Sequence, residues 1–379
     1  MRRVRFGLVL VALCFWINTV AQVPELSFNR LPGGRDLTSQ YVTSVTQDHY
    51  GYMWIGTRDG VNRYDGYEVR TYRSLSQNNP AGGVIGNIVE HMVVDGNNRV
   101  WASTTHGLAR FNWLSDRFEV VVSDKNLRGL PGPFLEYLYT TPDGSLVAVC
   151  DNSIYRYDDD TESFRLLYSS PLGLISVILV DSNGQWWIGH QYGKGIIHLP
   201  DINFPLDYKW FQSELFGSKT EYSVLSIAES DGSVWLARIQ LNSKLVRRYF
   251  ETGDERFFFY LFTDKAGRLW ACEYNGIKVR LPGMESFLSY SNKLSEPGSL
   301  SGGLLGVYVD NLKNVFTYHN GGGVNVSYWN RGFYTIRASG DYLWHTTRPN
   351  ITALSYDRNG NLWLGNNDGG FFRLVKPRN

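Results

Sequence analysis

The chain has 379 residues, among them 39 Gly, 24 Tyr, 20 Phe and 12 Trp. Aromatic residues favour strands and glycine favours tight turns, so this composition favours an all-β protein with many short strands. The 37 Lys and Arg nearly balance the 36 Asp and Glu, and a formal net charge of +1 argues against electrostatic binding of nucleic acid or an anionic membrane.

The first 21 residues have the layout of a secretion signal. A basic start at residues 1–5 is followed by an apolar run at 6–17 and by small residues that lead to Ala21. We expect cleavage after Ala21 and export of the rest. The alternative is an uncleaved membrane anchor, although the apolar run is shorter than the ~20 residues of a spanning helix.

A pattern D-x-x-G-x-φ-W, where φ is apolar, recurs along the chain at residues 48–54, 181–187, 264–270 and 357–363. Degenerate copies fill the gaps. With the Trp position as marker, the series is Trp54, Trp101, Val147, Trp187, Trp235, Trp270, Phe316 and Trp363. Self-similarity at about 47 residues is typical of a repeat architecture.

Each copy follows the same order of elements. An alternating apolar stretch such as 41–46 or 87–94 predicts a first strand, and the D-x-x-G is a turn in which Asp accepts backbone hydrogen bonds and Gly supplies a positive φ. The φ-W strand follows, and then third and fourth strands such as 61–64 and 67–72. Four antiparallel strands per copy predict a β-propeller blade. The Trp is expected to pack between blades rather than to stack on carbohydrate.

Two segments resemble an outer strand supplied ahead of a first blade, at residues 27–31 and 333–337. We therefore expect residues 24–330 to form a seven-bladed propeller, closed by pairing of the N-terminal strand into the last blade. Residues 331–379 would be the opening strand and first blade of a second, truncated propeller. The mature chain keeps Cys150 and Cys272, which lie in different copies and predict half-buried thiols rather than a disulfide framework.

The positions three residues after each marker should circle one mouth of the propeller channel. They differ in charge and size from copy to copy, unlike a position tied only to packing. With their neighbours they give a candidate ligand-binding ring of Arg58, His106, His190, Arg238, Glu273, Tyr274 and His319. Such a ring could hydrogen-bond sugar hydroxyls or a uronate carboxylate. The alternative is that these are solvated turn residues.

Catalytic and metal-binding constellations are hard to find in this sequence. The repeated Asp residues have a structural role in the turns, so paired carboxylates for glycoside cleavage cannot be assigned by spacing. His190 and His198 lack a metal-ligand spacing, and no G-x-S-x-G is present. We expect no catalytic residue, metal or cofactor.

The segment from Gln47 to Gly66 resembles the two-component regulator propeller repeat of periplasmic sensors in Bacteroidetes hybrid two-component systems. Residues 292–300 resemble the loop between blades of that family. The resemblance implies two seven-bladed propellers, a β-sandwich, a membrane helix, a histidine kinase, a receiver and a DNA-binding domain, with oligosaccharides as the signals. This chain would hold the first propeller and one blade of the second, without the kinase and output domains.

The resemblance makes a periplasmic, non-enzymatic module that senses an oligosaccharide the leading hypothesis. Its partners would be the remainder of the receptor or a second copy, and it would not bind nucleic acid through this region. One alternative is an exported lyase or hydrolase that uses His190, Arg238, Glu273 or His319. Another is a scaffold for protein contacts, since propellers host all three functions.

Overall fold

We describe a computed structural model of the chain. It describes residues 26–74, 86, 88–211, 224–237, 260–273, 276–293, 299–328, 351–356, 362–366 and 371–374. The expected signal peptide at 1–21 and the expected strand at 333–337 lie outside these residues. The chain divides into two compact units, Met1–Asn330 and Arg331–Asn379.

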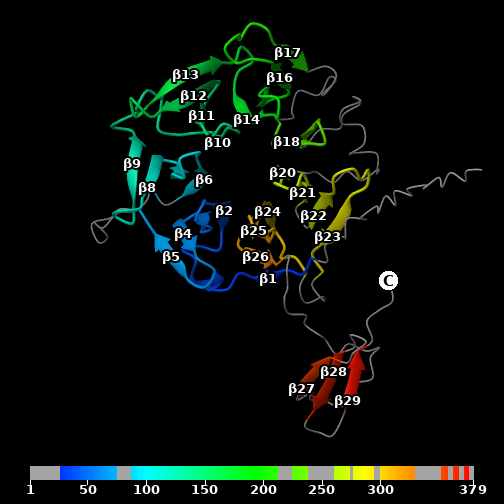
Figure 1. The fold of residues 1–379 in the computed structure, drawn as a ribbon. Helices are drawn as coiled ribbons and strands as arrows, with labels where there is room; N and C mark the ends of the chain where they lie inside the picture. Colours follow the sequence, from blue (N-terminus) through cyan, green and yellow to red (C-terminus); the bar gives the residue numbers. More distant parts are fainter. Residues whose placement is uncertain are drawn as a thin grey trace, which may run out of the picture. The chain divides into compact units, whose positions relative to one another are not determined.

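Within the described residues, the first unit contains six four-stranded antiparallel sheets and one two-stranded sheet, arranged around a common centre (Figure 1). In chain order the first three blades are β2 (Val42–Gln47), β3 (Met53–Thr57), β4 (Gly60–Tyr64) and β5 (Val69–Tyr72); β6 (Val89–Val94), β7 (Val100–Thr104), β8 (Gly107–Asn112) and β9 (Arg117–Ser123); and β10 (Tyr137–Thr140), β11 (Leu146–Cys150), β12 (Ser153–Asp158) and β13 (Ser163–Ser169).

The chain continues with β14 (Ile175–Val180), β15 (Trp186–His190), β16 (Ile196–Leu199) and β17 (Lys209–Phe211), and then with the two-stranded sheet β18 (Ile227–Ser230) and β19 (Ser233–Leu236). The last two blades are β20 (Tyr260–Thr263), β21 (Leu269–Glu273), β22 (Gly276–Arg280) and β23 (Leu288–Ser291), followed by β24 (Leu304–Val309), β25 (Val315–His319), β26 (Gly323–Ser327) and the N-terminal β1 (Asn29–Arg30). A short 3-10 turn, η1 (Gly34–Asp36), follows β1.

The N-terminal strand closes the ring, as the sequence predicted. Asn29 of β1 pairs with Val326 of β26, and the Leu31 amide donates to the Val324 carbonyl at 2.9 Å. The last blade therefore combines strands from both ends of the first unit. On its other side, Phe316 of β25 packs in one apolar cluster with residues of the first blade.

The expected blade count is wrong, because the described residues form six four-stranded blades rather than seven and a truncated one. Within the described residues, the fifth copy contributes β18 and β19, and residues 238–259 that follow lie outside them. The second unit contributes a three-stranded sheet of β27 (Ile351–Tyr356), β28 (Leu362–Asn366) and β29 (Phe371–Leu374). The repeated motif specifies the turn between a first and a second strand. It does not specify the outer strands, which were predicted from residues 61–64 and 67–72 of the first copy and expected by repetition in the others.

The repeated Asp binds both the turn and the Trp six residues later. Asp48 Oδ1 accepts from the amides of Tyr50 at 2.9 Å and Tyr52 at 3.0 Å, while its Oδ2 accepts from Trp54 Nε1 at 2.7 Å. The same three bonds recur at Asp95, Asp181 and Asp264. The motif spacing is thus explained by one carboxylate that satisfies two turn amides and an indole N–H.

Three of the marker tryptophans pack against the following blade, as predicted. Trp54, Trp101 and Trp270 are 0% exposed. Trp54 shares a cluster with Val89 and Phe111 of the second blade, and Trp101 and Trp270 pack in the same way on the blades that follow them. Cys150 and Cys272 are buried free thiols.

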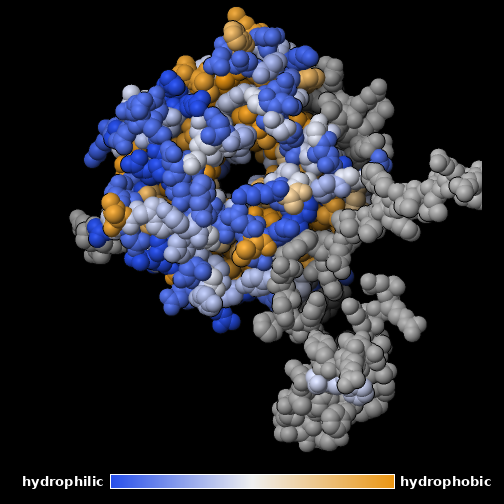
Figure 2. Space-filling model, in the orientation of Figure 1, coloured by the Kyte–Doolittle hydropathy of each residue, from blue (hydrophilic) through white to orange (hydrophobic). Residues whose placement is uncertain are grey.

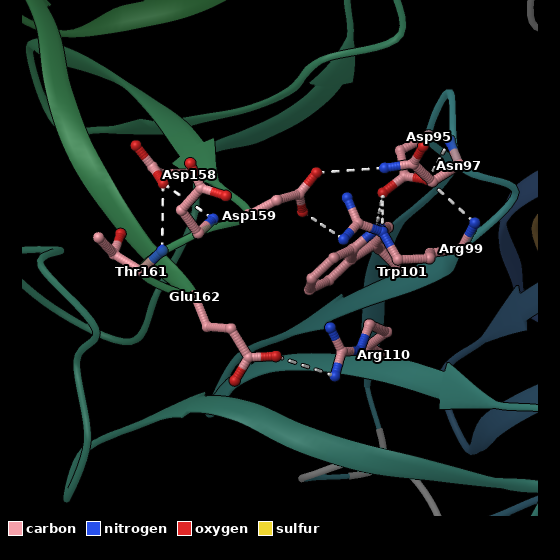
Figure 3. A network of polar contacts seen from close by, with 10 residues as sticks. Asp95, Asn97, Arg99, Trp101, Arg110, Asp158, Asp159, Thr161 and Glu162 are labelled. Atoms are coloured by element: carbon pink, nitrogen blue, oxygen red, sulfur yellow. Dashed lines mark hydrogen bonds and ion pairs between the residues drawn. The ribbon is translucent and has the colours of Figure 1, made fainter.

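Polar contacts also join neighbouring blades near these turns. Between the second and third blades, Asn97 Nδ2 donates to Asp159 Oδ2 at 3.1 Å, Arg99 pairs with Asp159, and Arg110 pairs with Glu162 (Figure 3). At the ring closure, the Asn311 amide donates to Gln47 Oε1 at 2.9 Å. Because each such contact joins two copies, the blades are fixed to one another at this end of the ring.

Candidate functional site

The first strand of each copy lies nearest the centre of the ring (Figure 1). Four of these strands carry a β-bulge at the same place. In the first blade, Val42 pairs with Thr57 and Ser44 pairs with Gly56, so Thr43 is the extra residue of the bulge. The equivalent residues in the other three strands are Glu90, Ser176 and Leu305. Bulges re-aim side chains and are common beside binding sites.

The bulges mark one end of the ring, and the positions three residues after the markers share this end. Thr57, Thr104, His190 and His319 are the last residues of their second strands, and each pairs with the residue just before a bulge. The D-x-x-G turns therefore lie at the opposite end, since each joins the other ends of the same two strands. Figure 2 shows the surface of the ring hollowed near its middle. We call the bulged end of this hollow the mouth.

Two of the predicted ligand residues, His190 and His319, are 0% exposed. His190 Nε2 lies 2.7 Å from Ser170 Oγ, and His319 Nδ1 lies 3.2 Å from the Gly302 carbonyl oxygen. Burial lowers the pKa of each histidine to about 4, so both are neutral at pH 7. These two contacts join each strand end to its neighbouring loop.

The other predicted ligand residues are differently placed. Arg58 and His106 are exposed, and the Arg58 guanidinium lies 5.4 Å from the centre of the Tyr41 ring. Glu273 is partly buried and forms an ion pair of 2.9 Å with Lys278. Arg238 and Tyr274 lie outside the described residues. The structure thus places exposed and buried members of the set at the ends of separate blades.

Tyrosines from three blades approach one another at the centre of the ring. Tyr137 comes from β10, Tyr260 from β20 and Tyr318 from β25. The rings of Tyr260 and Tyr318 meet edge to face with centroids 6.3 Å apart, and their side chains are hydrogen-bonded. Burial raises the pKa of Tyr137, and the nearby Tyr260 phenol raises it further. The three phenols therefore stay protonated at neutral pH, and the partly exposed Tyr137 and Tyr260 offer hydroxyl groups.

Gly306 allows Tyr318 to reach this place from a second strand. The two residues pair directly across β24 and β25, and a Cβ at Gly306 would overlap the hydroxyl end of the Tyr318 ring. The ring therefore lies over the bare backbone of the inner strand. We call Tyr137, Tyr260 and Tyr318 the tyrosine floor.

Two carboxylates, Glu90 and Glu136, belong to inner-strand ends at the mouth. Glu136 immediately precedes β10, and its Oε2 accepts from the Asp151 amide at 2.9 Å. His91, next to the bulged Glu90, has its Nε2 3.0 Å from the Glu136 carbonyl oxygen and its ring 5.4 Å from that of Tyr137. Burial raises the pKa of Glu136 and lowers that of His91. Because His91 is neutral, it does not offset the negative charge of these carboxylates.

The mouth residues on the first strands were not predicted from the sequence, because the candidate ring was placed at the ends of the second strands. A signal existed: the bulged residue stands five positions before the turn Asp, which gives Thr43, Glu90, Ser176 and Leu305 from Asp48, Asp95, Asp181 and Asp310. This position varies between hydroxyl, carboxylate and alkyl groups, as expected for a surface that faces a ligand. In the part of the chain that the structure describes, no cluster of metal-binding side chains is found.

The two-component regulator propeller family matches the chain at residues 36–59 and 347–368, which confirms the resemblance seen in the first copy. A protein described as histidine kinase P4 from Formosa agariphila is 36% identical over 64 residues, 17% of this chain and 4% of that protein. This chain therefore corresponds to a small part of that relative's length.

Solved structures share the fold. The extracellular domain of a protein described as a hybrid two-component system from B. thetaiotaomicron is 22% identical with a TM-score of 0.66, over 92% of this chain and 49% of that one. A second extracellular domain from B. thetaiotaomicron is 19% identical with a TM-score of 0.62, over 93% and 46%. Virginiamycin B lyase from Staphylococcus aureus has a TM-score of 0.58 at 14% identity, over 79% and 98%. The chain thus spans about half the length of the first two structures.

Among the residues that the structure describes, none form a helix with the length and hydrophobicity of a membrane span.

Proposed function

We propose that this chain is a periplasmic, ligand-sensing propeller of a two-component signalling receptor and that its ligand is an oligosaccharide. The observation that carries this proposal is the family match at residues 36–59 and 347–368, in a chain whose fold follows extracellular domains of proteins described as hybrid two-component systems over 92% and 93% of its length. The secretion-type N-terminus supports export. Binding would act by favouring one arrangement of the propeller relative to the remainder of the receptor or to a second copy.

The mouth is suited to a polyhydroxylated ligand. Tyrosine rings offer flat apolar faces together with hydroxyl groups, and the bulged Thr43 and Ser176 add further hydroxyls. The described residues offer no arrangement of nucleophile and base open to substrate, because His190 and His319 are buried and neutral. These observations support binding rather than turnover.

The test is a screen of the purified full chain against oligosaccharides released from many glycans, read by thermal shift and by isothermal titration. We expect at least one oligosaccharide to raise the unfolding temperature in proportion to the logarithm of its concentration. The parent polysaccharides should stay intact on incubation. Absence of binding across the screen would refute the sensing role, and release of product from a polymer would favour the exported-enzyme alternative.

A further inference from the structure

The hollow at the mouth has a floor that ties opposite sides of the ring together. Tyr137 lies in the third blade, whereas Tyr260 and Tyr318 lie in the last two, and the electrostatic influence of their phenols on one another requires that the side chains approach across the centre. Tyr318 does so over Gly306, without a side chain from the inner strand between. Tyr318 is 6% exposed, so the partly exposed Tyr137 and Tyr260 supply the aromatic surface that the floor presents to the hollow.

The charges of the inner strands have one sign in the described residues. No Lys or Arg lies on the inner strands β2, β6, β10, β14, β18, β20 and β24. Glu90 and Glu229 lie on these strands, and Glu136 directly precedes β10. Glu229 lies near the opposite end, where it accepts from Ser182 Oγ at 2.6 Å. Glu90 and Glu136 are therefore the charges of the inner wall at the mouth.

Other charged groups stand farther out at this end. Arg58 and Lys194 are exposed on the turns after the second strands, and Asp59 and Asp151 lie on the same set of turns. Arg58 is over Tyr41, and Asp59 is paired with Arg73 at 3.0 Å. Because these groups face water, their fields are screened more strongly than those of the half-buried Glu136.

We propose that the mouth is a blind pocket for one sugar ring without negative charge, neutral or amine-bearing, with an apolar ring face on the tyrosine floor and hydroxyl or amine groups toward Glu90 and Glu136. This inference rests on the proposed sensing function and adds to it the class of ligand. A uronate or sulfated ring would bring an anion next to a partly desolvated carboxylate, with no cation on the described inner strands to offset the repulsion.

The experiment is an array of neutral, amine-bearing, uronate-containing and sulfated oligosaccharides presented to the full chain, followed by titration of the best binder of each class. We expect the anionic classes to bind at least tenfold more weakly than the best neutral or amine-bearing sugar. Glu136→Gln should reduce this difference at least fivefold. Glu229→Gln, the matched carboxylate near the other end of an inner strand, should leave the difference unchanged.

A second set of variants locates the site. Tyr137→Phe keeps the ring and removes a hydroxyl, whereas Tyr137→Ala removes the ring, and far-UV circular dichroism verifies that each variant folds. We expect Tyr137→Ala to weaken binding more than tenfold and Tyr137→Phe less than threefold. Binding that survives Tyr137→Ala in a folded protein would overturn the pocket.

The outcomes separate the two proposals. If an anionic oligosaccharide binds most tightly and its binding is lost in the Tyr137→Ala variant, the charge inference is overturned and the sensing function is still supported. No binding by any class would overturn the sensing function and the inference together.

Discussion

Replacement of Asp264 by Ala tests the physical basis of the repeat. Asp264 Oδ1 accepts from the amides of Ala266 at 2.9 Å and Arg268 at 3.1 Å. Its Oδ2 accepts from Trp270 Nε1 at 2.8 Å and Arg268 Nε at 2.6 Å. The side chains of Asp264 and Arg268 are 2% and 5% exposed, so the variant leaves a buried guanidinium without this carboxylate and a buried indole N–H without an acceptor.

Removal of one partner of a buried ion pair costs roughly 3–5 kcal/mol, and the lost turn bonds act in the same direction. We expect Asp264→Ala to lower the free energy of unfolding by about 4 kcal/mol. Urea unfolding of the full chain, followed by far-UV circular dichroism, measures the change from the shift in midpoint.

A double-mutant cycle with Trp270→Phe isolates the indole bond. The last blade supplies a natural comparison, because Phe316 replaces Trp there and Asn314 Nδ2 donates to Asp310 Oδ2 at 2.8 Å instead. We expect a coupling free energy of about 1–2 kcal/mol between positions 264 and 270. A cost below about 1 kcal/mol for Asp264→Ala, or a coupling near zero, would refute the view that this carboxylate explains the motif spacing.

Three further predictions follow from local geometry. Burial lowers the pKa of His190 and His319 to about 4 from an ordinary 6.5, so each histidine stabilises the folded state above pH 6.5, and up to about 3 kcal/mol per histidine is lost as the pH falls toward 4. The midpoint of urea unfolding should therefore fall less steeply between pH 7.5 and 4.5 in His190→Asn than in the unchanged protein. An unchanged slope would contradict the assignment. Lys313 has a φ of 69°, where a side chain is strained, so Lys313→Gly should raise the free energy of unfolding by about 0.5–1 kcal/mol while Lys313→Ala gives no such gain. Gly306→Ala should lower the free energy of unfolding by about 1–3 kcal/mol because its methyl group overlaps the Tyr318 ring. In the double variant with Tyr318→Ala, the loss should be smaller than the sum of the two single losses, and a loss equal to that sum would disprove the overlap.

The turn of each copy could be predicted from the sequence because its interactions are local. One Asp binds amides two and four residues on and an indole six residues on, so a fixed spacing records the geometry directly. The alternation of apolar residues before the Asp predicted the inner strands for the same reason. The closing strand β1 was also predictable, because its distance from Trp54 suits an outer strand supplied in advance.

Only the tertiary structure decided what meets at the centre of the ring. Tyr137 and Tyr318 are separated by 181 residues, and no local spacing encodes their approach, which depends on the closure of the ring and on the bare backbone of Gly306. The same limit applies to His190 and His319: their place in the repeat was predictable, but their burial was not, because it depends on the loops that cover each strand end. Short-range hydrogen bonds fixed the repeat unit, and packing between distant copies decided which of its varying positions line the mouth and which are buried within the wall.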